Sequence, residues 1–128
     1  MSAMSDYLEN EILDHILGTG AFTHPSTVYV GLATATFGEG NTGTELSGSG
    51  YARQSATFSV ASGGTTSNSA AIEFPAATGS WGTVSHFGIF DASSSGNLLI
   101  HGAFSASKSI ASGDILKIDT GDLDVTAA

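Results

Sequence analysis

The sequence contains no cysteine, only two prolines and only three basic residues among 128. Without cysteine the chain forms no disulfide, thiolate zinc site or thiol nucleophile, and a domain of this length can bury a core without such links. The three cations, Arg53, Lys108 and Lys117, stand against twelve acidic residues and give a formal net charge of −9. Clustered cations are what neutralise phosphates, so neither a nucleic acid nor an anionic membrane surface is an expected partner.

Long apolar runs are also missing. No stretch reaches the roughly 18 apolar residues that a membrane-spanning helix needs. The first residues lack the basic-then-apolar order of a secretory signal peptide. We therefore expect a soluble protein that is not exported by the general secretory route and that forms a single domain over residues 1–128.

Small side chains dominate what is present. More than half of the residues are Ser, Thr, Gly or Ala, and 12% are charged, against roughly 25% in an average soluble domain. A surface of such residues loses little side-chain entropy when it is immobilised at a contact. The composition favours a subunit of an assembly, although Ser/Thr-rich secreted adhesins share it.

An amphipathic helix is predicted over residues 5–17, within an N-terminal arm of residues 1–20. Ser5 is a suitable N-cap, and two glycines follow the last apolar residue. Five apolar side chains fall close to one stripe of the helix: Leu8, Ile12, Leu13, Ile16 and Leu17. We expect this face to pack against the β core or a neighbouring subunit, with Leu8, Ile12 and Ile16 as candidate contact residues.

Residues 26–125 are predicted to form antiparallel β structure. Alternating or continuous apolar stretches bounded by turn residues indicate strands. The main expected strands cover residues 28–32, 51–60, 69–74, 81–91, 98–104 and 115–119. Residues 37–50 are glycine-rich without periodicity and predict a long exposed loop or bulged edge. The fold class is therefore mainly β, a short N-terminal α-helix followed by an antiparallel β-sandwich or jelly-roll-like barrel.

No motif in the sequence points to catalysis. The Gly-x-Ser-x-Gly elbow, the P-loop and the dinucleotide fingerprint are all missing, so no enzymatic activity and no cofactor are expected. His86 and His101 fall on two strands that would bring the imidazoles close if they form a hairpin, with Asp91 nearby. Interior or interface histidines hydrogen-bonded to the backbone are nevertheless favoured over a metal site. Residues 119–124 hold three aspartates without the spacing of an EF-hand, and solvated carboxylates are favoured over a calcium site.

Four residues of the β region are candidate interface or packing residues: Tyr51, Arg53, Trp81 and Phe87. Arg53 is the only arginine and stands near Tyr51, so we expect a bidentate contact with a carboxylate of the same or a neighbouring subunit. Trp81 is the only tryptophan and is expected to anchor a core or an interface. A carbohydrate-binding groove usually displays several exposed aromatic rings, and a carbohydrate-binding module stays only an alternative.

Four ordered blocks of the sequence resemble a family of tailed-bacteriophage virion structural proteins. The blocks are residues 27–32, 50–54, 69–75 and 81–91. Members are described as tail-fibre-like, and some relatives serve as capsid decoration (cement) proteins. The resemblance runs from the first helix to about Leu123, and it implies a non-enzymatic virion component. It brings no catalytic residues with it.

Between these two roles the sequence favours capsid decoration. A receptor-binding fibre needs reach from a long repetitive shaft, and this chain has no internal repeat. A small β protein that clamps a capsid lattice commonly forms a closed ring, and a trimer is favoured. The expected partners are copies of itself and the major capsid protein or another virion protein. The expected location is the virion, on the capsid exterior rather than the tail, after synthesis in the host cytoplasm. The alternative is a tail-fibre-like or other appendage for host attachment.

Overall fold

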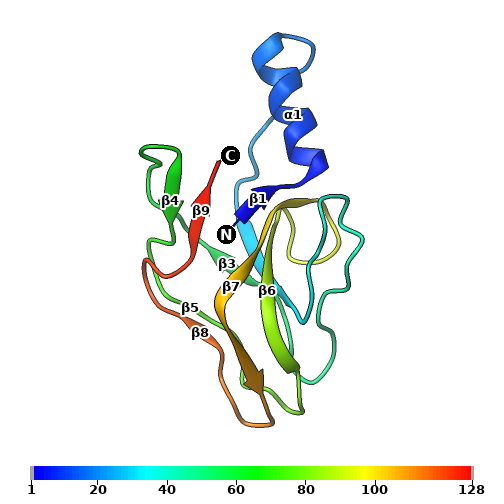
Figure 1. Ribbon diagram of the computed structural model, residues 1–128, viewed down its shortest axis with the longest axis vertical. Helices are drawn as coiled ribbons and strands as arrows, with labels where there is room; N and C mark the ends of the chain where they lie inside the picture. Colours follow the sequence, from blue (N-terminus) through cyan, green and yellow to red (C-terminus); the bar gives the residue numbers. More distant parts are fainter. Residues whose placement is uncertain (1, 128) are drawn as a thin grey trace.

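The computed structural model describes residues 2–127, which fold into nine strands and one helix (Figure 1). In chain order the elements are β1 (Ser2–Met4), α1 (Asp6–Leu17), β2 (Val28–Ala33), β3 (Gln54–Ala56), β4 (Thr65–Ser67), β5 (Ile72–Glu73), β6 (Gly82–Phe90), β7 (Leu98–Ile110), β8 (Lys117–Ile118) and β9 (Asp124–Thr126). The predicted fold class, mainly β after one short N-terminal helix, is confirmed. Within the described residues, no helix has the length and apolar content needed to cross a bilayer.

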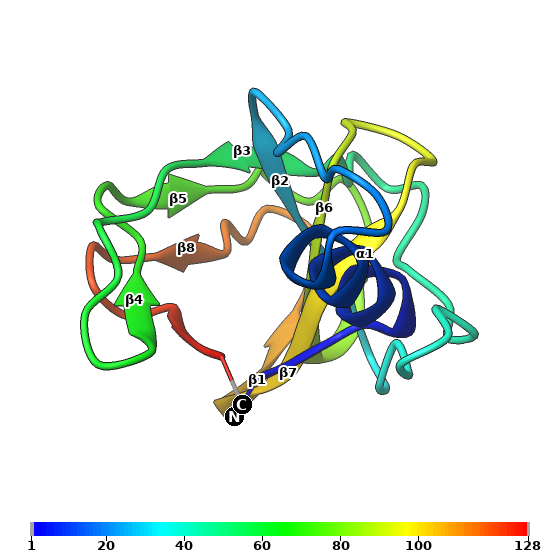
Figure 2. The same ribbon diagram turned by 90° about the horizontal axis from the view of Figure 1, so that it is seen from above.

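All strand pairings are antiparallel and form one large and two small sheets. The large sheet has the order β1-β7-β6-β2-β3. Two-stranded ribbons, β4-β9 and β5-β8, make up the rest. Viewed from above, the β5-β8 ribbon lies across from β6 and β7, so the two layers enclose the core as in a sandwich (Figure 2).

The core follows from the period-two alternation of the strands. Val30 lies opposite Ile89 across the β2–β6 pair, and Leu32 lies opposite Phe87. All four are at most 3% exposed and belong to one apolar cluster, which Ile118 of β8 joins from the other layer. The hairpin expected from the second half of the sequence is present as β6 and β7, joined by the turn at residues 92–97.

Several predicted strand limits are wrong. The strand expected over residues 51–60 shortens to β3, and the one expected over 115–119 shortens to β8. By contrast, β7 continues to Ile110 instead of ending near residue 104, because it pairs with β6 along its far half after a bulge. Pairing partners therefore set these limits, and residue alternation alone does not reveal them.

The stretch 37–50, predicted to be an exposed loop, begins in the interior. Phe37 is 1% exposed and its ring meets that of Phe90 edge to face, with centroids 5.5 Å apart. Together with Ala33 and Leu98 they form a second small core on the outer face of the large sheet. The loop thus covers the face of the large sheet that the ribbons leave open.

Asn68 is a buried polar residue that joins the two halves of the β region. Its Nδ2 donates to the carbonyl oxygens of Ala70 at 2.8 Å and Asp119 at 3.0 Å. Its Oδ1 accepts from the backbone N–H of Leu123 at 2.9 Å. The side chain therefore replaces strand pairing where β4 and β5 meet the β8–β9 segment.

Asn68→Ala should lower the free energy of unfolding by about 1–3 kcal/mol, because buried backbone groups lose their partners. Urea unfolding followed by tryptophan fluorescence measures this directly. Asn10→Ala, at an exposed position of α1, is the matched control and should change stability by less than about 0.5 kcal/mol. Equal stability of the two variants would show that water satisfies the groups around Asn68.

Candidate functional site

The root of α1 is held firmly to the large sheet. Ser5 is 1% exposed, and its Oγ accepts the N–H of Leu8 at 3.2 Å as an N-cap. The same hydroxyl donates to the carbonyl of Leu98 at 2.5 Å, and the N–H of Ser5 donates to Leu99 O at 2.8 Å. Because β1 also pairs with β7, the first turn of the helix has a fixed position.

The far half of α1 rises away from the β body (Figure 1). Leu8 is buried, whereas Ile12 is 37% exposed and Ile16 is 72% exposed. Of the two expected packing partners, the chain's own β core is therefore wrong beyond the first turn, and a neighbouring subunit stays a prediction. At 3.6 residues per turn, Ile12, Leu13, Ile16 and Leu17 lie within about 140° of the helix circumference. These four residues are named here the α1 ridge.

An apolar hollow of about 250 Å³ lies at the foot of α1. Helix, linker and both layers contribute to its lining, which includes Leu8, Phe22, Val28, Phe58, Ile100 and Val125. None of its ten lining residues carries a charge, and Thr66 is the one with a hydroxyl. We call this hollow the basal groove. Sequence reasoning missed it because its residues come from six distant parts of the chain.

A buried ionic cluster ties the long loop to the β6–β7 turn. The Arg53 side chain is 7% exposed, and its Nε and Nη2 donate to the two carboxylate oxygens of Glu45 at 2.9 and 2.8 Å. Its Nη1 donates to the carbonyls of Ala92 and Ser95, both at 2.8 Å. The guanidinium lies 3.6 Å from the ring centroid of Phe90. The expected bidentate contact is thus made within the chain.

Tyr51 completes this cluster. Its hydroxyl donates to Glu45 at 2.5 Å and accepts the backbone N–H of Leu32 at 2.9 Å. Burial, followed by the hydrogen bond to Glu45, raises the pKa of Tyr51 well above its ordinary value. The phenol is therefore a fixed donor at neutral pH. A β-carbon on Gly31 would lie 2.7 Å from Glu45 Oε2, so glycine is required there for the cluster to close.

We call Glu45, Tyr51 and Arg53 the Arg53 clasp. Their hydrogen-bonding groups are directed at one another and at backbone atoms. A catalytic arrangement would instead leave an acid, base or nucleophile facing a substrate. The clasp therefore serves to fix two loops.

Trp81 and Phe87 are core residues, 5% and 3% exposed. The indole N–H of Trp81 donates to Ser49 O at 2.9 Å, and Tyr51 meets its ring edge to face at 5.6 Å. Phe87 packs against Phe104 at 5.4 Å. Neither buried ring offers a surface for a partner or a sugar.

The two strand histidines belong to no cluster of three or more potential metal ligands within residues 2–127. His86 pairs with Ala103 and His101 pairs with Gly88, so the imidazoles are diagonal neighbours on β6 and β7. Nδ1 of His86 is 2.7 Å from the hydroxyl of Ser85, and Nε2 of His101 is buried without a hydrogen-bond partner in the described structure. Asp91 is occupied elsewhere, since its carboxylate accepts from the backbone and side chain of Asn97.

Within residues 2–127, one cluster of three carboxylates has the spacing of a metal site. Oxygens of Asp6, Glu9 and Glu39 all lie within 4.8 Å of one another at the start of α1. The positive end of the helix dipole already favours acidic residues there. Sequence reasoning missed this group because Glu39 is distant in the chain. The aspartates of residues 119–124 form no such group in the part of the chain that the structure describes.

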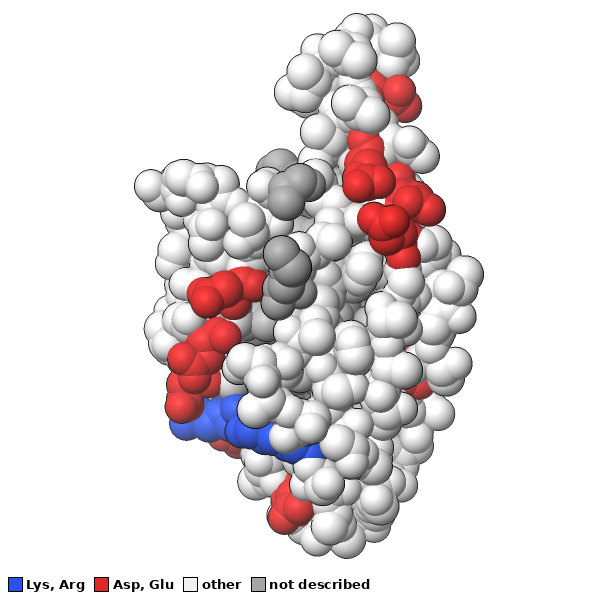
Figure 3. Space-filling model, in the orientation of Figure 1, with Lys and Arg blue, Asp and Glu red and all other residues white. Residues whose placement is uncertain are grey.

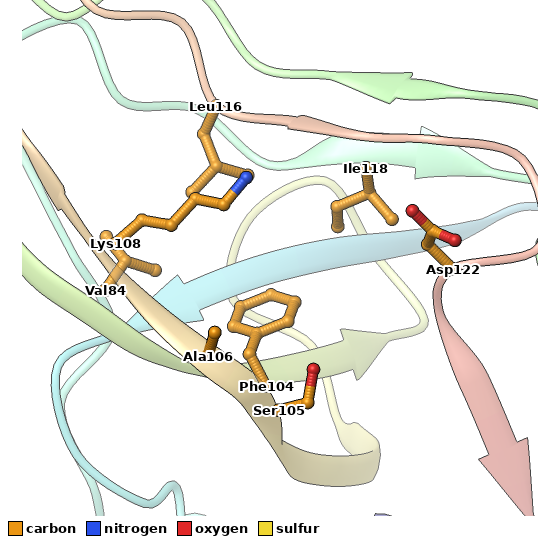
Figure 4. A pocket seen from close by; sticks show the side chains of 8 residues that line it. All are labelled: Val84, Phe104, Ser105, Ala106, Lys108, Leu116, Ile118 and Asp122. Carbon is orange, nitrogen blue, oxygen red and sulfur yellow. The ribbon is translucent and has the colours of Figure 1, made fainter.

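A second hollow, of about 330 Å³, opens between the bulged part of β7 and β8 (Figure 4). Phe104, Leu116 and Ile118 form its apolar wall, while Lys108 and Asp122 lie at opposite ends. Both charged residues are exposed. Their separation leaves no converging set of polar groups, so this hollow lacks the features of a catalytic site.

Comparison with known proteins gives one family. The family model described as "Podophage GP4 fiber I protein gp80" matches residues 3–126. The matched span includes α1 and every strand from β2 to β9. No curated protein matches the chain.

Proposed function

Because the chain belongs to this family of podophage fibre proteins, and is thus a structural protein of a tailed-phage virion, we propose that it is a subunit of a fibre-like appendage that works by assembly and without catalysis. The structural observation that carries the proposal is the α1 ridge. It leaves large apolar side chains uncovered on a helix whose root is rigidly held. Such a helix suits a contact with another protein chain.

The surface charge supports a contact through apolar groups. On the face shown in Figure 3, acidic residues line α1 and gather again lower on the molecule, and Lys and Arg appear only beside this second group. A chain with a net charge of −9 repels its own copies wherever carboxylates meet. Assembly of several copies, for which we propose a trimer, therefore requires uncharged surfaces such as the α1 ridge.

Capsid decoration is the second candidate, and one observation favours it. The described residues form one β body and a helix of 12 residues, without a repetitive shaft. A decoration protein would bind the major capsid protein on the outside of the head. The family match supports the fibre-like role instead, and for that role we propose another virion protein as the partner.

Phage particles that lack this protein should assemble and keep their DNA on heating, but should adsorb to host cells more slowly. An appendage acts at the host surface, whereas a decoration protein binds the shell and stabilises it by mass action. Adsorption rate and temperature of DNA release are measured on the same preparation. Normal adsorption with release at a lower temperature would favour decoration and contradict the proposal.

A further inference from the structure

The α1 ridge and the basal groove form one continuous apolar surface. Leu8 belongs both to the apolar side of α1 and to the lining of the groove. Beyond it the α1 ridge becomes steadily more exposed, from 37% at Ile12 to 72% at Leu17. One chain therefore carries an uncovered apolar projection and an uncovered apolar recess side by side.

The two surfaces have matching chemistry. An amphipathic helix binds a hydrophobic groove through side chains spaced by three or four residues. Ile12 with Ile16, and Leu13 with Leu17, have this spacing. The basal groove offers half-buried side chains such as Val28, Phe58 and Ile100 to receive them.

The absence of charge in the basal groove indicates which kind of surface binds there. A basic or polar segment of a partner could form no ion pair in the basal groove, because no lining residue is ionisable. Glu11 lies on the side of α1 opposite the α1 ridge and Asp14 lies outside it, so both stay in solvent when the ridge is covered. Glu9 lies on the ridge side, one turn nearer the root of the helix, where its carboxylate is close to those of Asp6 and Glu39. Contact between the four ridge residues and the groove lining thus joins two copies of a strongly acidic chain through uncharged side chains.

We propose that the α1 ridge of one copy of this chain occupies the basal groove of another copy. The inference rests on the proposed function, because it names the partner through which an appendage subunit assembles. Each ridge then fills one groove and each groove receives one ridge, an arrangement that closes for two copies or for three. The apolar surface left open in the single chain is covered in the assembly.

Disulfide trapping tests this contact without interference, because the natural chain has no cysteine. Ile16→Cys places one thiol on the α1 ridge, and Thr66→Cys places one at the basal groove. The two purified variants are mixed, allowed to exchange subunits and oxidised, and covalent dimers are measured on non-reducing gels. We expect a dimer band in the mixture that neither variant gives alone. Ser93→Cys, in the exposed β6–β7 turn, replaces Thr66→Cys in the control mixture and should give none.

Two results would overturn the inference. A dimer band from Ile16→Cys alone, as strong as that of the mixture, would show that the helices pack on one another instead of in the grooves. A mixture no different from the Ser93→Cys control would show that the basal groove receives no second copy. Neither result depends on where the protein lies on the virion, so the proposed function is judged separately by adsorption and particle stability.

A quantitative measurement complements the trapping. Ile16→Asp should raise the dissociation constant of self-association by about tenfold or more, the effect of losing one well-buried apolar side chain. Ile16→Leu preserves the apolar area and should leave the constant nearly unchanged. Sedimentation velocity over a concentration series gives both values. Unchanged association of Ile16→Asp, or a natural chain that is monomeric throughout, would contradict the inference.

Discussion

Arg53→Ala should lower the free energy of unfolding by about 3–5 kcal/mol, the usual result of removing one partner from a buried ion pair. Glu45 would lose both of its guanidinium hydrogen bonds, and the carbonyls of Ala92 and Ser95 would lose their donor. Phe90 would also lose the group that covers its ring. Thermal and urea unfolding followed by circular dichroism measure the effect.

A second ion pair within residues 2–127 provides a matched control. Lys117 and Asp119 lie 3.8 Å apart with side chains 51% and 71% exposed, so Lys117→Ala should change stability by less than about 1 kcal/mol. Arg53→Lys should fall between the two, because one ammonium group cannot occupy the planar fork of contacts. Similar losses for Arg53→Ala and Lys117→Ala would mean that the Arg53 clasp contributes little.

The sequence predicts the fold class well because local patterns carry it. The cap at Ser5, the apolar stripe of α1 and the alternation around Val30 and Leu32 each depend on neighbouring residues, and each appears in the structure. Strand ends are predicted less well because they depend on partners far away. The ribbons β4-β9 and β5-β8 join segments more than 40 residues apart, and no local pattern selects those pairs.

The candidate site is predicted only in part, for the same reason. The sequence indicates that Arg53 needs a carboxylate, but several acidic residues qualify and only the folded loop brings Glu45 to it. Trp81 and Phe87 pack in the interior and the partly buried Tyr51 packs against the same core, in agreement with their aromatic character. A role at an interface stays a prediction for Ile12 and Ile16, the candidate residues whose side chains are exposed.

Leu8 and Ile16 share the apolar side of α1, yet substitution should separate their roles. Leu8→Ala should lower the free energy of unfolding by about 2–4 kcal/mol, because Leu8 is 8% exposed and its loss leaves a cavity where the helix meets the sheet. Ile16→Ala should change the stability of the single chain by less than about 0.5 kcal/mol, because its side chain is 72% exposed there. Chemical unfolding at concentrations below the onset of self-association measures both.

The effects of the two variants on self-association should rank in the opposite order to their effects on stability. Ile16→Ala should weaken self-association while the fold is intact, whereas Leu8→Ala should weaken it only as far as the fold itself is lost. A large loss of stability for Ile16→Ala at low concentration would mean that the far half of α1 folds back onto the β body in solution. Equal stability of Leu8→Ala and the natural chain would mean that the root of α1 is not fixed, and the α1 ridge would then lack the rigid support that its proposed contact requires.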